Sequence, residues 1–327
     1  MKFNVIGAGT WGVVFSSYLV KNNHDVIVFH RDTPKSNIII KTKRHPSLPE
    51  HIISNKIIFT SRLDDLDLKN HTILAVPSYA LPEYIKLINN KDCKFLILSK
   101  GFNMESGMLP LELFSTKFNI NNIALLSGPN HAEEISNNKP TATVISSKNN
   151  NFSQFLQKSL SSKTFRIYTS QDVNGVQIGG AVKNVIAIAS GLCEGLKLGD
   201  NAQASLVSRG MNEILELSKV YNFKNSTIFG LSGLGDLVAT CYSNYSRNKQ
   251  LGLLLSKGKT LNNSIDEIGM VSEGVNTSKV LHGIIIKNSL NMPICTEIYN
   301  ILFNNDDPQK SLLKLMTREL TLEYSNN

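Results

Sequence analysis

Several polar side chains have types and positions suited to acid–base chemistry on a small anionic molecule. Lys183 lies in an otherwise apolar run of small residues, where burial would lower the pKa of its ammonium group toward neutral pH. A lysine of that kind can act as a general acid or base. The same sequence fits equally well a surface lysine, with its aliphatic stem along the helix and its ammonium group in water. Asp236 directly follows the glycine-rich segment 230–235, which predicts a tight turn that presents a carboxylate.

A second group of side chains is suited to holding a phosphate. Ser246, Arg247 and Asn248 are consecutive and offer a hydroxyl, a guanidinium group and an amide before a predicted helix. A capped helix start with a surface arginine is at least as good an interpretation of these three residues alone. Lys100 follows a predicted strand and could contact a nucleotide, an anion or a carbonyl group, although a solvated lysine fits this position as well.

The elements that must position these side chains begin at the N-terminus. A short apolar run, 3–6, is followed by Gly7-Ala8-Gly9-Thr10-Trp11-Gly12 and then by a helical pattern. A strand, Gly-x-Gly-x-x-Gly and a helix in this order predict a dinucleotide-binding turn. Gly7 permits the tight turn, Gly9 allows a pyrophosphate to approach the backbone, and Gly12 allows the helix to pack closely on the strand.

The end of the second predicted strand, 25–30, bears on the choice of nucleotide. NAD-selective units place an acidic residue there, whereas this chain has His30 and Arg31, followed by Asp32. An arginine can pair with the 2′-phosphate of NADP(H), so this nucleotide should be accepted, and Asp32 leaves NAD(H) open. A surface arginine without a ligand is the alternative.

The remaining pattern predicts two kinds of architecture in one chain. Strands predicted at 57–60, 72–76, 94–98, 123–126 and 141–146 alternate with helices or loops, which indicates a mainly parallel sheet with ligands at the carboxyl ends of its strands. A long helix follows at 173–191, and then only helical patterns, at 202–221, 246–257, 264–268, 277–287, 296–303 and 308–320. We therefore predict an α/β Rossmann-type N-terminal domain over 1–180 and an all-α C-terminal domain over 181–327.

The composition argues against several other classes of protein. The chain has 327 residues and a net charge of +8, but its Lys and Arg are spread out rather than clustered with aromatic residues, so no nucleic acid is predicted as a partner. Its four cysteines form no Cys-x-x-Cys pair, which argues against a metal site and fits the cytoplasm. No signal peptide precedes the glycine turn, and no uninterrupted apolar run approaches the ~18 residues of a membrane span.

Motifs along essentially the whole chain resemble those of bacterial NAD(P)-dependent glycerol-3-phosphate dehydrogenases. They are Gly-Ala-Gly-Thr-Trp-Gly, His30-Arg31, Val-Pro-Ser, Ser-Lys-Gly, Ser-Gly-Pro, Gly-Gly-Ala-Val-Lys-Asn, Leu-Ser-Gly-Leu-Gly-Asp-Leu, Ser-Arg-Asn and Val271-Ser272-Glu273-Gly274. The resemblance implies reversible reduction of dihydroxyacetone phosphate to sn-glycerol 3-phosphate with NADP(H) or NAD(H), which supplies phospholipid synthesis. It is compatible with a homodimer.

The resemblance also implies roles for individual residues. Lys183 matches the catalytic lysine, and Asp236 matches a carboxylate that would orient and tune it. The nucleotide-binding positions are Gly7, Gly9, Thr10, Trp11, Gly12, Arg31, Lys100, Ala132, Arg247, Val271 and Glu273. The substrate-binding positions are Lys100, Gly128, Asn130, Lys183, Asp236, Ser246, Arg247 and Asn248. One departure is Asn130-His131, where many relatives carry Ser or Thr followed by Phe; Asn130 keeps a hydrogen-bond donor there.

Two other functions stay open on the residues alone. The first is a different two-domain dehydrogenase with a catalytic lysine on the helix between its domains, acting on a 3-hydroxy acid or a sugar acid. Those substrates carry a carboxylate in place of a phosphate, so activity on a phosphorylated triose discriminates between them. The second is a nucleotide-binding sensor without turnover, against which the presence of both Lys183 and Asp236 argues.

Overall fold

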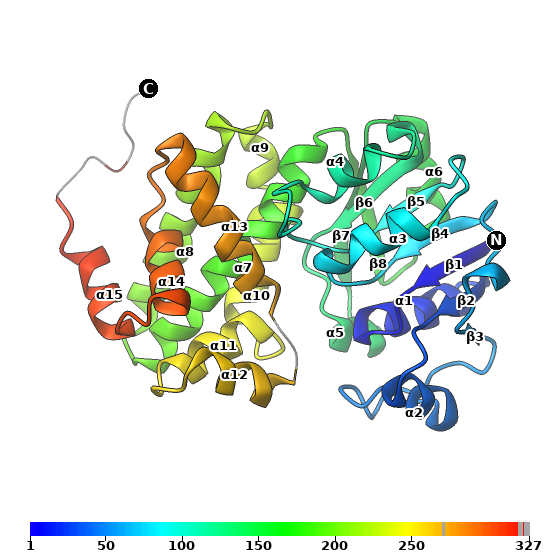
Figure 1. Ribbon diagram of the computed structural model, residues 1–327, viewed down its shortest axis with the longest axis horizontal. Helices are drawn as coiled ribbons and strands as arrows, with labels where there is room; N and C mark the ends of the chain where they lie inside the picture. The colour runs from blue at the N-terminus through cyan, green and yellow to red at the C-terminus, as the bar shows by residue number, and fades with distance from the viewer. Residues whose placement is uncertain (270–271, 320–322, 324–327) are drawn as a thin grey trace.

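The structure, a computed structural model, describes residues 1–269, 272–319 and 323 and consists of a sheet half and a helical half (Figure 1). The sheet has eight strands in the order β3-β2-β1-β4-β5-β6-β7-β8, and only the β6–β7 pair is antiparallel among those described. The strands are β1 (Lys2–Ile6), β2 (Asp25–Phe29), β3 (Ile58–Thr60), β4 (His71–Leu74), β5 (Phe95–Ile97), β6 (Ile123–Ser127), β7 (Thr141–Ser147) and β8 (Phe165–Ser170).

Helices cover both faces of this sheet, which is why its central strands are apolar almost throughout. Successive residues of a strand point to opposite faces. Val5 therefore belongs to a core cluster with α1 (Thr10–Lys21), α5 (Ala132–Ser136) and α6 (Asn150–Leu160). Its neighbour Ile6 belongs to a second cluster with α3 (Leu81–Leu87) and α4 (Pro110–Ser115). The short helix α2 (Pro34–Thr42) adds Ile39 to the first cluster.

The predicted strands are confirmed to within two residues at each end, and the Rossmann-type sheet with them. One strand, β8, was not predicted. It lies at the edge of the sheet and, among the described strands, pairs only with β7. Its exposed Arg166 and Tyr168 alternate with the buried Phe165 and Ile167. A strand with a single apolar face and so few residues carries a weak signal in the sequence.

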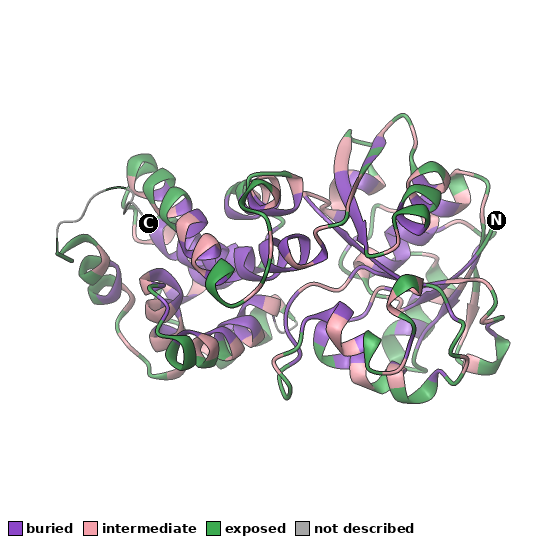
Figure 2. Ribbon diagram, turned by 90° about the horizontal axis from the view of Figure 1, so that it is seen from above, coloured by how far each residue is buried: buried purple, intermediate pink, exposed green. Residues whose placement is uncertain are grey.

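The helical half is built around α7 (Val173–Gly195). This helix contacts α8 (Asp200–Glu216), α10 (Asp236–Tyr242), α11 (Arg247–Leu255), α13 (Glu273–Asn288) and α14 (Pro293–Phe303). Figure 2 shows buried residues continuing from the strands into this central helix. By length and composition α7 could cross a membrane, but its 18-residue apolar stretch is buried inside the protein. The other helices described in this half are α9 (Asn225–Ile228), α12 (Leu261–Ile268) and α15 (Pro308–Met316).

The helical C-terminal half is confirmed, with one correction at the glycine-rich segment. The sequence predicted a tight turn at 230–235, whereas Leu231–Gly235 forms a turn of π-helix that leads directly into α10. A Cβ atom at Gly233 would lie 2.0 Å from the Ile228 carbonyl oxygen, so this glycine allows close packing rather than reversal of the chain. A Cβ atom at Gly179 of α7 would lie 2.6 Å from the carbonyl oxygen of Ser232, so only a glycine lets α7 lie against this turn.

Helix α11 lies directly on the backbone of α7. A Cβ atom at Gly252 would lie 2.1 Å from the carbonyl oxygen of Ile188, and one at Gly191 would lie 2.0 Å from that of Lys249. Neither contact tolerates a side chain. Because α11 begins at Arg247, this packing also fixes where its first residues lie relative to Lys183.

The α7–α11 contact predicts a stability difference between two glycine substitutions. We expect Gly252→Ala to destabilise the protein by about 1–3 kcal/mol or more, since the two helices must move apart. Gly283→Ala is the matched control, because Gly283 is also inside a helix but has nothing within 4 Å of its Cβ position. It should stabilise by about 0.5–1 kcal/mol through helix propensity. Urea unfolding measures both, and equal effects would contradict the described contact.

Candidate active site

The predicted site residues come together where the sheet half meets the helical half. Gly7 follows β1, Lys100 follows β5 and Gly128 follows β6, so all three lie at the carboxyl edge of the sheet. From the other side, α7 brings Lys183, α10 begins at Asp236, and α11 follows Ser246. Residues far apart in the sequence thus line one junction.

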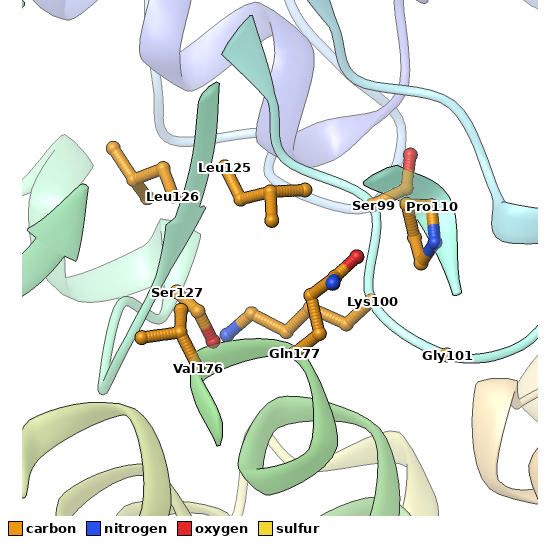
Figure 3. Close-up of a pocket in the computed structure, with 9 residues that line it drawn as sticks. All are labelled: Ser99, Lys100, Gly101, Pro110, Leu125, Leu126, Ser127, Val176 and Gln177. Carbon is orange, nitrogen blue, oxygen red and sulfur yellow. The ribbon is translucent and has the colours of Figure 1, made fainter. Parts of the chain in front are cut away.

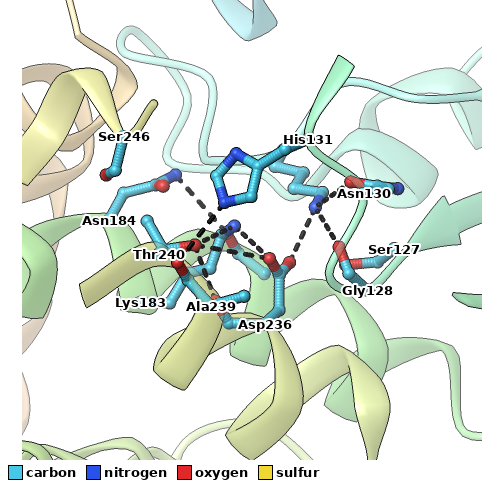
Figure 4. Close-up of polar contacts among 12 residues, drawn as sticks. Ser127, Gly128, Asn130, His131, Lys183, Asn184, Asp236, Ala239, Thr240 and Ser246 are labelled. Atoms are coloured by element: carbon cyan, nitrogen blue, oxygen red, sulfur yellow. Dashed lines mark hydrogen bonds and ion pairs between the residues drawn. The ribbon is translucent and has the colours of Figure 1, made fainter. Parts of the chain in front are cut away.

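Lys183 and Asp236 form a buried ion pair at the centre of this junction (Figure 4). The Lys183 ammonium group donates one hydrogen bond to Asp236 Oδ1 and another, of 2.8 Å, to Thr240 Oγ1. Lys183 is 6% exposed and Asp236 is 2% exposed. The structure therefore favours the buried lysine over the surface lysine, the two interpretations that the sequence left open.

Lys100 reaches the same carboxylate from the sheet half. Its Nζ atom lies 2.7 Å from Asp236 Oδ2 and also donates to the Gly128 carbonyl oxygen at 3.1 Å and to Asn130 Oδ1 at 3.2 Å. Its stem passes a small cavity lined by the ends of β5 and β6 and by the first turn of α7, where its ammonium group lies beside Ser127 (Figure 3). Asp236 is thus held between two ammonium groups from opposite halves.

The same contacts determine the protonation states of Lys183 and Asp236. Burial lowers the pKa of Lys183 to about 8, and the nearby Lys100 charge adds to this shift while Asp236 opposes it. Burial alone would raise the pKa of Asp236, but the two lysines lower it below its ordinary value. Asp236 is consequently ionised at neutral pH, and Lys183 can give up or take a proton near pH 8.

The glycine turn has the geometry expected for a dinucleotide-binding loop. Gly7 has φ of +114°, and a Cβ atom at Gly12 would lie 2.0 Å from the Gly7 carbonyl oxygen, so α1 packs directly on the turn. A Cβ atom at Gly9 would meet nothing within 4 Å, and Gly9 caps α1 without a side-chain hydrogen bond. The turn is therefore open where a pyrophosphate would bind, and its residues fit that group.

The other predicted nucleotide positions lie around this turn. Thr10 and Trp11 begin α1, and Ala132 begins α5, which contacts α1. Arg31 lies in a groove with Gly7, Ala8 and Pro77 and forms an ion pair of 2.8 Å with Glu83. The use of NADP(H) that Arg31 suggests stays a prediction.

The three predicted phosphate-binding residues differ in what they contact. Ser246 caps α11, and its Oγ accepts a hydrogen bond of 3.3 Å from the Lys249 amide, so the capped helix start is confirmed. Asn248 donates to Asn184 Oδ1 and accepts from the Gly274 amide, both at 3.0 Å. Its side chain thus joins α11 to α7 and α13.

Glu273 connects the helical half to the sheet half a second time, and the charge of Arg247 acts on it. Glu273 accepts hydrogen bonds from the Ser78 amide at 3.0 Å and from Ser78 Oγ at 2.7 Å. Burial raises the pKa of Glu273, while these bonds and the Arg247 charge oppose the shift. The guanidinium group of Arg247 therefore lies close enough to act on Glu273. Val271, also predicted to contact the nucleotide, lies outside the described residues.

Sequence reasoning missed four contacting residues of this site: Thr240, Asn184, Ser78 and His131. Thr240 follows Asp236 by one helical turn, so their spacing in a helix could have identified it. Asn184 and Ser78 belong to quoted motifs without an assigned role. His131 Nε2 lies 3.4 Å from the Ala239 carbonyl oxygen, above the Lys183–Asp236 pair in Figure 4, and had no signal beyond its position after Asn130.

Comparisons with known proteins agree with this arrangement. Residues 2–153 match the family model for the NAD-dependent glycerol-3-phosphate dehydrogenase N-terminus, and residues 172–313 match that for the C-terminus. Glycerol-3-phosphate dehydrogenase [NAD(P)+] of Clostridium acetobutylicum is 36% identical, with 98% of each chain covered, and that of Fusobacterium nucleatum is 36% identical, with 100% of this chain and 99% of the relative covered.

A solved structure gives the same result. The crystal structure of glycerol-3-phosphate dehydrogenase from Coxiella burnetii superposes with a TM-score of 0.91 at 31% identity, over 97% of this chain and 99% of the other. Two family models that together span most of the chain, full-length relatives above 30% identity and this superposition lead to one assignment. The chain belongs to the NAD-dependent glycerol-3-phosphate dehydrogenase family.

Proposed function

We propose that this protein reversibly reduces dihydroxyacetone phosphate to sn-glycerol 3-phosphate with NADP(H) or NAD(H), a product that phospholipid synthesis consumes. The observation that carries the proposal is the buried Lys183–Asp236–Lys100 group at the junction of the sheet half and the helical half. The names of the full-length relatives support it. When bound, a nicotinamide dinucleotide supplies the hydride for the carbonyl carbon.

In this proposal Lys183 supplies the proton. Reduction of a ketone places negative charge on the carbonyl oxygen, which needs both a nearby cation and a proton. Lys183 offers both, and the reverse reaction takes the proton back at the same Nζ atom. Asp236 and Thr240 accept hydrogen bonds from that atom and so orient it. Lys100 adds a second cation from the sheet half.

Arg247 and Ser246 would hold the phosphate of the substrate. Arg247 is the first residue of α11, where the helix dipole also favours an anion, and Ser246 keeps its hydroxyl proton for donation while it caps the helix. A phosphate held away from the reacting carbon would fix the ketone relative to Lys183. Asn248, whose side-chain atoms are already paired, would keep α11 in place.

The proposal assigns different tasks to the two halves of the chain. Residues 1–180 would bind the nucleotide, and residues 181–327 would supply Lys183, Asp236 and Arg247. The boundary falls inside α7, so one continuous helix would join the two tasks.

The cytoplasm is supported as the location by four cysteines without a disulfide. A homodimer stays a prediction.

Replacing Lys183 tests the assigned chemistry. We expect wild-type protein to oxidise NADPH with dihydroxyacetone phosphate, and Lys183→Met to lower kcat by about 10²–10⁴-fold while the Kd for NADPH stays unchanged. Lys183→Arg keeps the positive charge but cannot release a proton, so it should lose activity too. NADPH absorbance and nucleotide fluorescence measure the two quantities. Turnover of a 3-hydroxy acid in place of the triose phosphate would contradict the proposed substrate.

The pKa of Lys183 predicts opposite pH dependences for the two directions. Reduction needs the protonated ammonium group, so its rate should fall as pH rises through about 8, where burial places the pKa of Lys183, whereas oxidation should rise. Asp236→Asn removes the charge that raises the pKa of Lys183, so both inflections should move to lower pH. Glu194→Gln is the control, because the Glu194 carboxylate is paired with Lys249 instead of Lys183. This substitution should leave both inflections in place. Unmoved inflections in Asp236→Asn would argue against this coupling.

Replacing Arg247 tests the phosphate contact. Arg247→Gln should raise the KM for dihydroxyacetone phosphate by about 10–100-fold, because a charge-assisted contact is worth roughly 1.5–3 kcal/mol. The kcat/KM for unphosphorylated dihydroxyacetone serves as the control and should be the same in variant and wild type. An equal loss on both substrates would mean that Arg247 supports the fold of the site rather than the phosphate.

A further inference from the structure

His45 is a buried histidine on the loop that follows α2, and none of the roles given above involves it. Its side chain is only 1% exposed. The ring lies against the start of α1, with Nδ1 3.4 Å from Thr10 Oγ1. The carbonyl oxygen of His45 accepts a hydrogen bond of 2.9 Å from the Leu48 amide, so a tight turn holds the residue in place. His45 is therefore fixed beside the glycine turn.

The hydrogen bonds of Nδ1 determine which ring nitrogen carries the proton. The Ser47 amide donates to Nδ1 at 3.1 Å, so Nδ1 must be the acceptor and Nε2 must carry the hydrogen. Burial, with the charges of Lys35 and Arg247, lowers the pKa of His45 to about 4. The ring is consequently neutral at neutral pH and offers one N–H donor, at Nε2.

That donor is buried and has no hydrogen-bond partner among the described residues. A buried N–H without an acceptor costs about 1–3 kcal/mol, and native proteins rarely leave one in place without a reason. The surroundings identify the kind of acceptor that is missing. The first turn of α1 lacks a side-chain cap, and the positive charge of Arg247, from the opposite half, is close enough to act on His45. Both features attract an anion.

We propose that His45 Nε2–H donates a hydrogen bond to a phosphoryl oxygen of a bound ligand. The contact of His45 with Thr10, the first residue of α1, makes the pyrophosphate of the dinucleotide the expected source. The phosphate of the triose is the second source, because the charge of Arg247, its proposed ligand, also acts on His45. If the acceptor is the triose phosphate, this inference rests on the proposed function. If the acceptor is the pyrophosphate, it rests only on the glycine turn.

Two substitutions separate the donor from the rest of the ring. Asparagine can place an acceptor near the Nδ1 position for the Ser47 amide but does not reach the Nε2 position, whereas glutamine can place an N–H donor near Nε2. His45→Asn should therefore weaken ligand binding by about tenfold, the loss of one hydrogen bond to a charged group. His45→Gln should restore most of that affinity. His51→Asn is the matched control, because His51 Nε2 already contacts Ser17 Oγ at 3.0 Å.

The experiment measures the Kd for NADPH by fluorescence without substrate and, separately, the KM for dihydroxyacetone phosphate at saturating NADPH. A higher Kd in His45→Asn that His45→Gln reverses identifies the pyrophosphate as the acceptor. The same pattern in KM alone identifies the triose phosphate. Unchanged constants, or equal losses in both variants, overturn the inference, with thermal unfolding confirming that each variant folds. If wild type binds NADPH but does not reduce dihydroxyacetone phosphate, the proposed function fails while the Kd comparison still decides the role of His45.

Discussion

The site depends on one carboxylate that forms ion pairs with two ammonium groups at the junction of the two halves. Asp236 contacts Lys183 of α7 on one oxygen and Lys100, which follows β5, on the other. Charges removed from water cost several kcal/mol each unless they are paired. Neither lysine could stay close to the other without this partner. The electrostatic requirement of the lysines therefore holds the sheet half and the helical half together at the place where substrate would bind.

Backbone packing makes that pairing geometrically feasible. Asp236 reaches Lys183 because the preceding π-helical turn lies against Gly179, where a side chain would collide with the Ser232 carbonyl group. Helix α11 also lies directly against α7, because Gly252 has no side chain to collide with the α7 backbone. Glycine inside a helix costs about 1 kcal/mol relative to alanine. The glycines of α7 and α11 offset that cost by allowing charged and polar side chains from three helices to converge on one point.

How much could be predicted from the sequence depended on how local each signal was. The glycine turn and the alternation of strands and helices are local patterns, and the structure confirms them. The apolar run around Lys183 is local too, but it left a buried and a surface lysine equally open, and only the structure decides between them. The capped start of α11 is equally local. By contrast, the Ser78–Glu273 contact joins residues 195 positions apart, and nothing near either residue signals the other. The π-helical turn and the edge strand β8 were also missed, because glycine-rich segments and short one-faced strands fit several structures.

The second connection between the halves explains why the two ligand sites cannot be treated separately. Glu273 at the start of α13 accepts hydrogen bonds from both the amide and the hydroxyl group of Ser78. Ser78 follows β4 at the nucleotide edge of the sheet. Arg247, at the start of α11, acts electrostatically on Glu273 and on His45. One guanidinium group thus influences a carboxylate of the helical half and a ring beside the glycine turn. A ligand phosphate that binds near Arg247 would alter the field at both, so nucleotide and triose phosphate should affect each other's binding through this charge rather than through a distant change of fold.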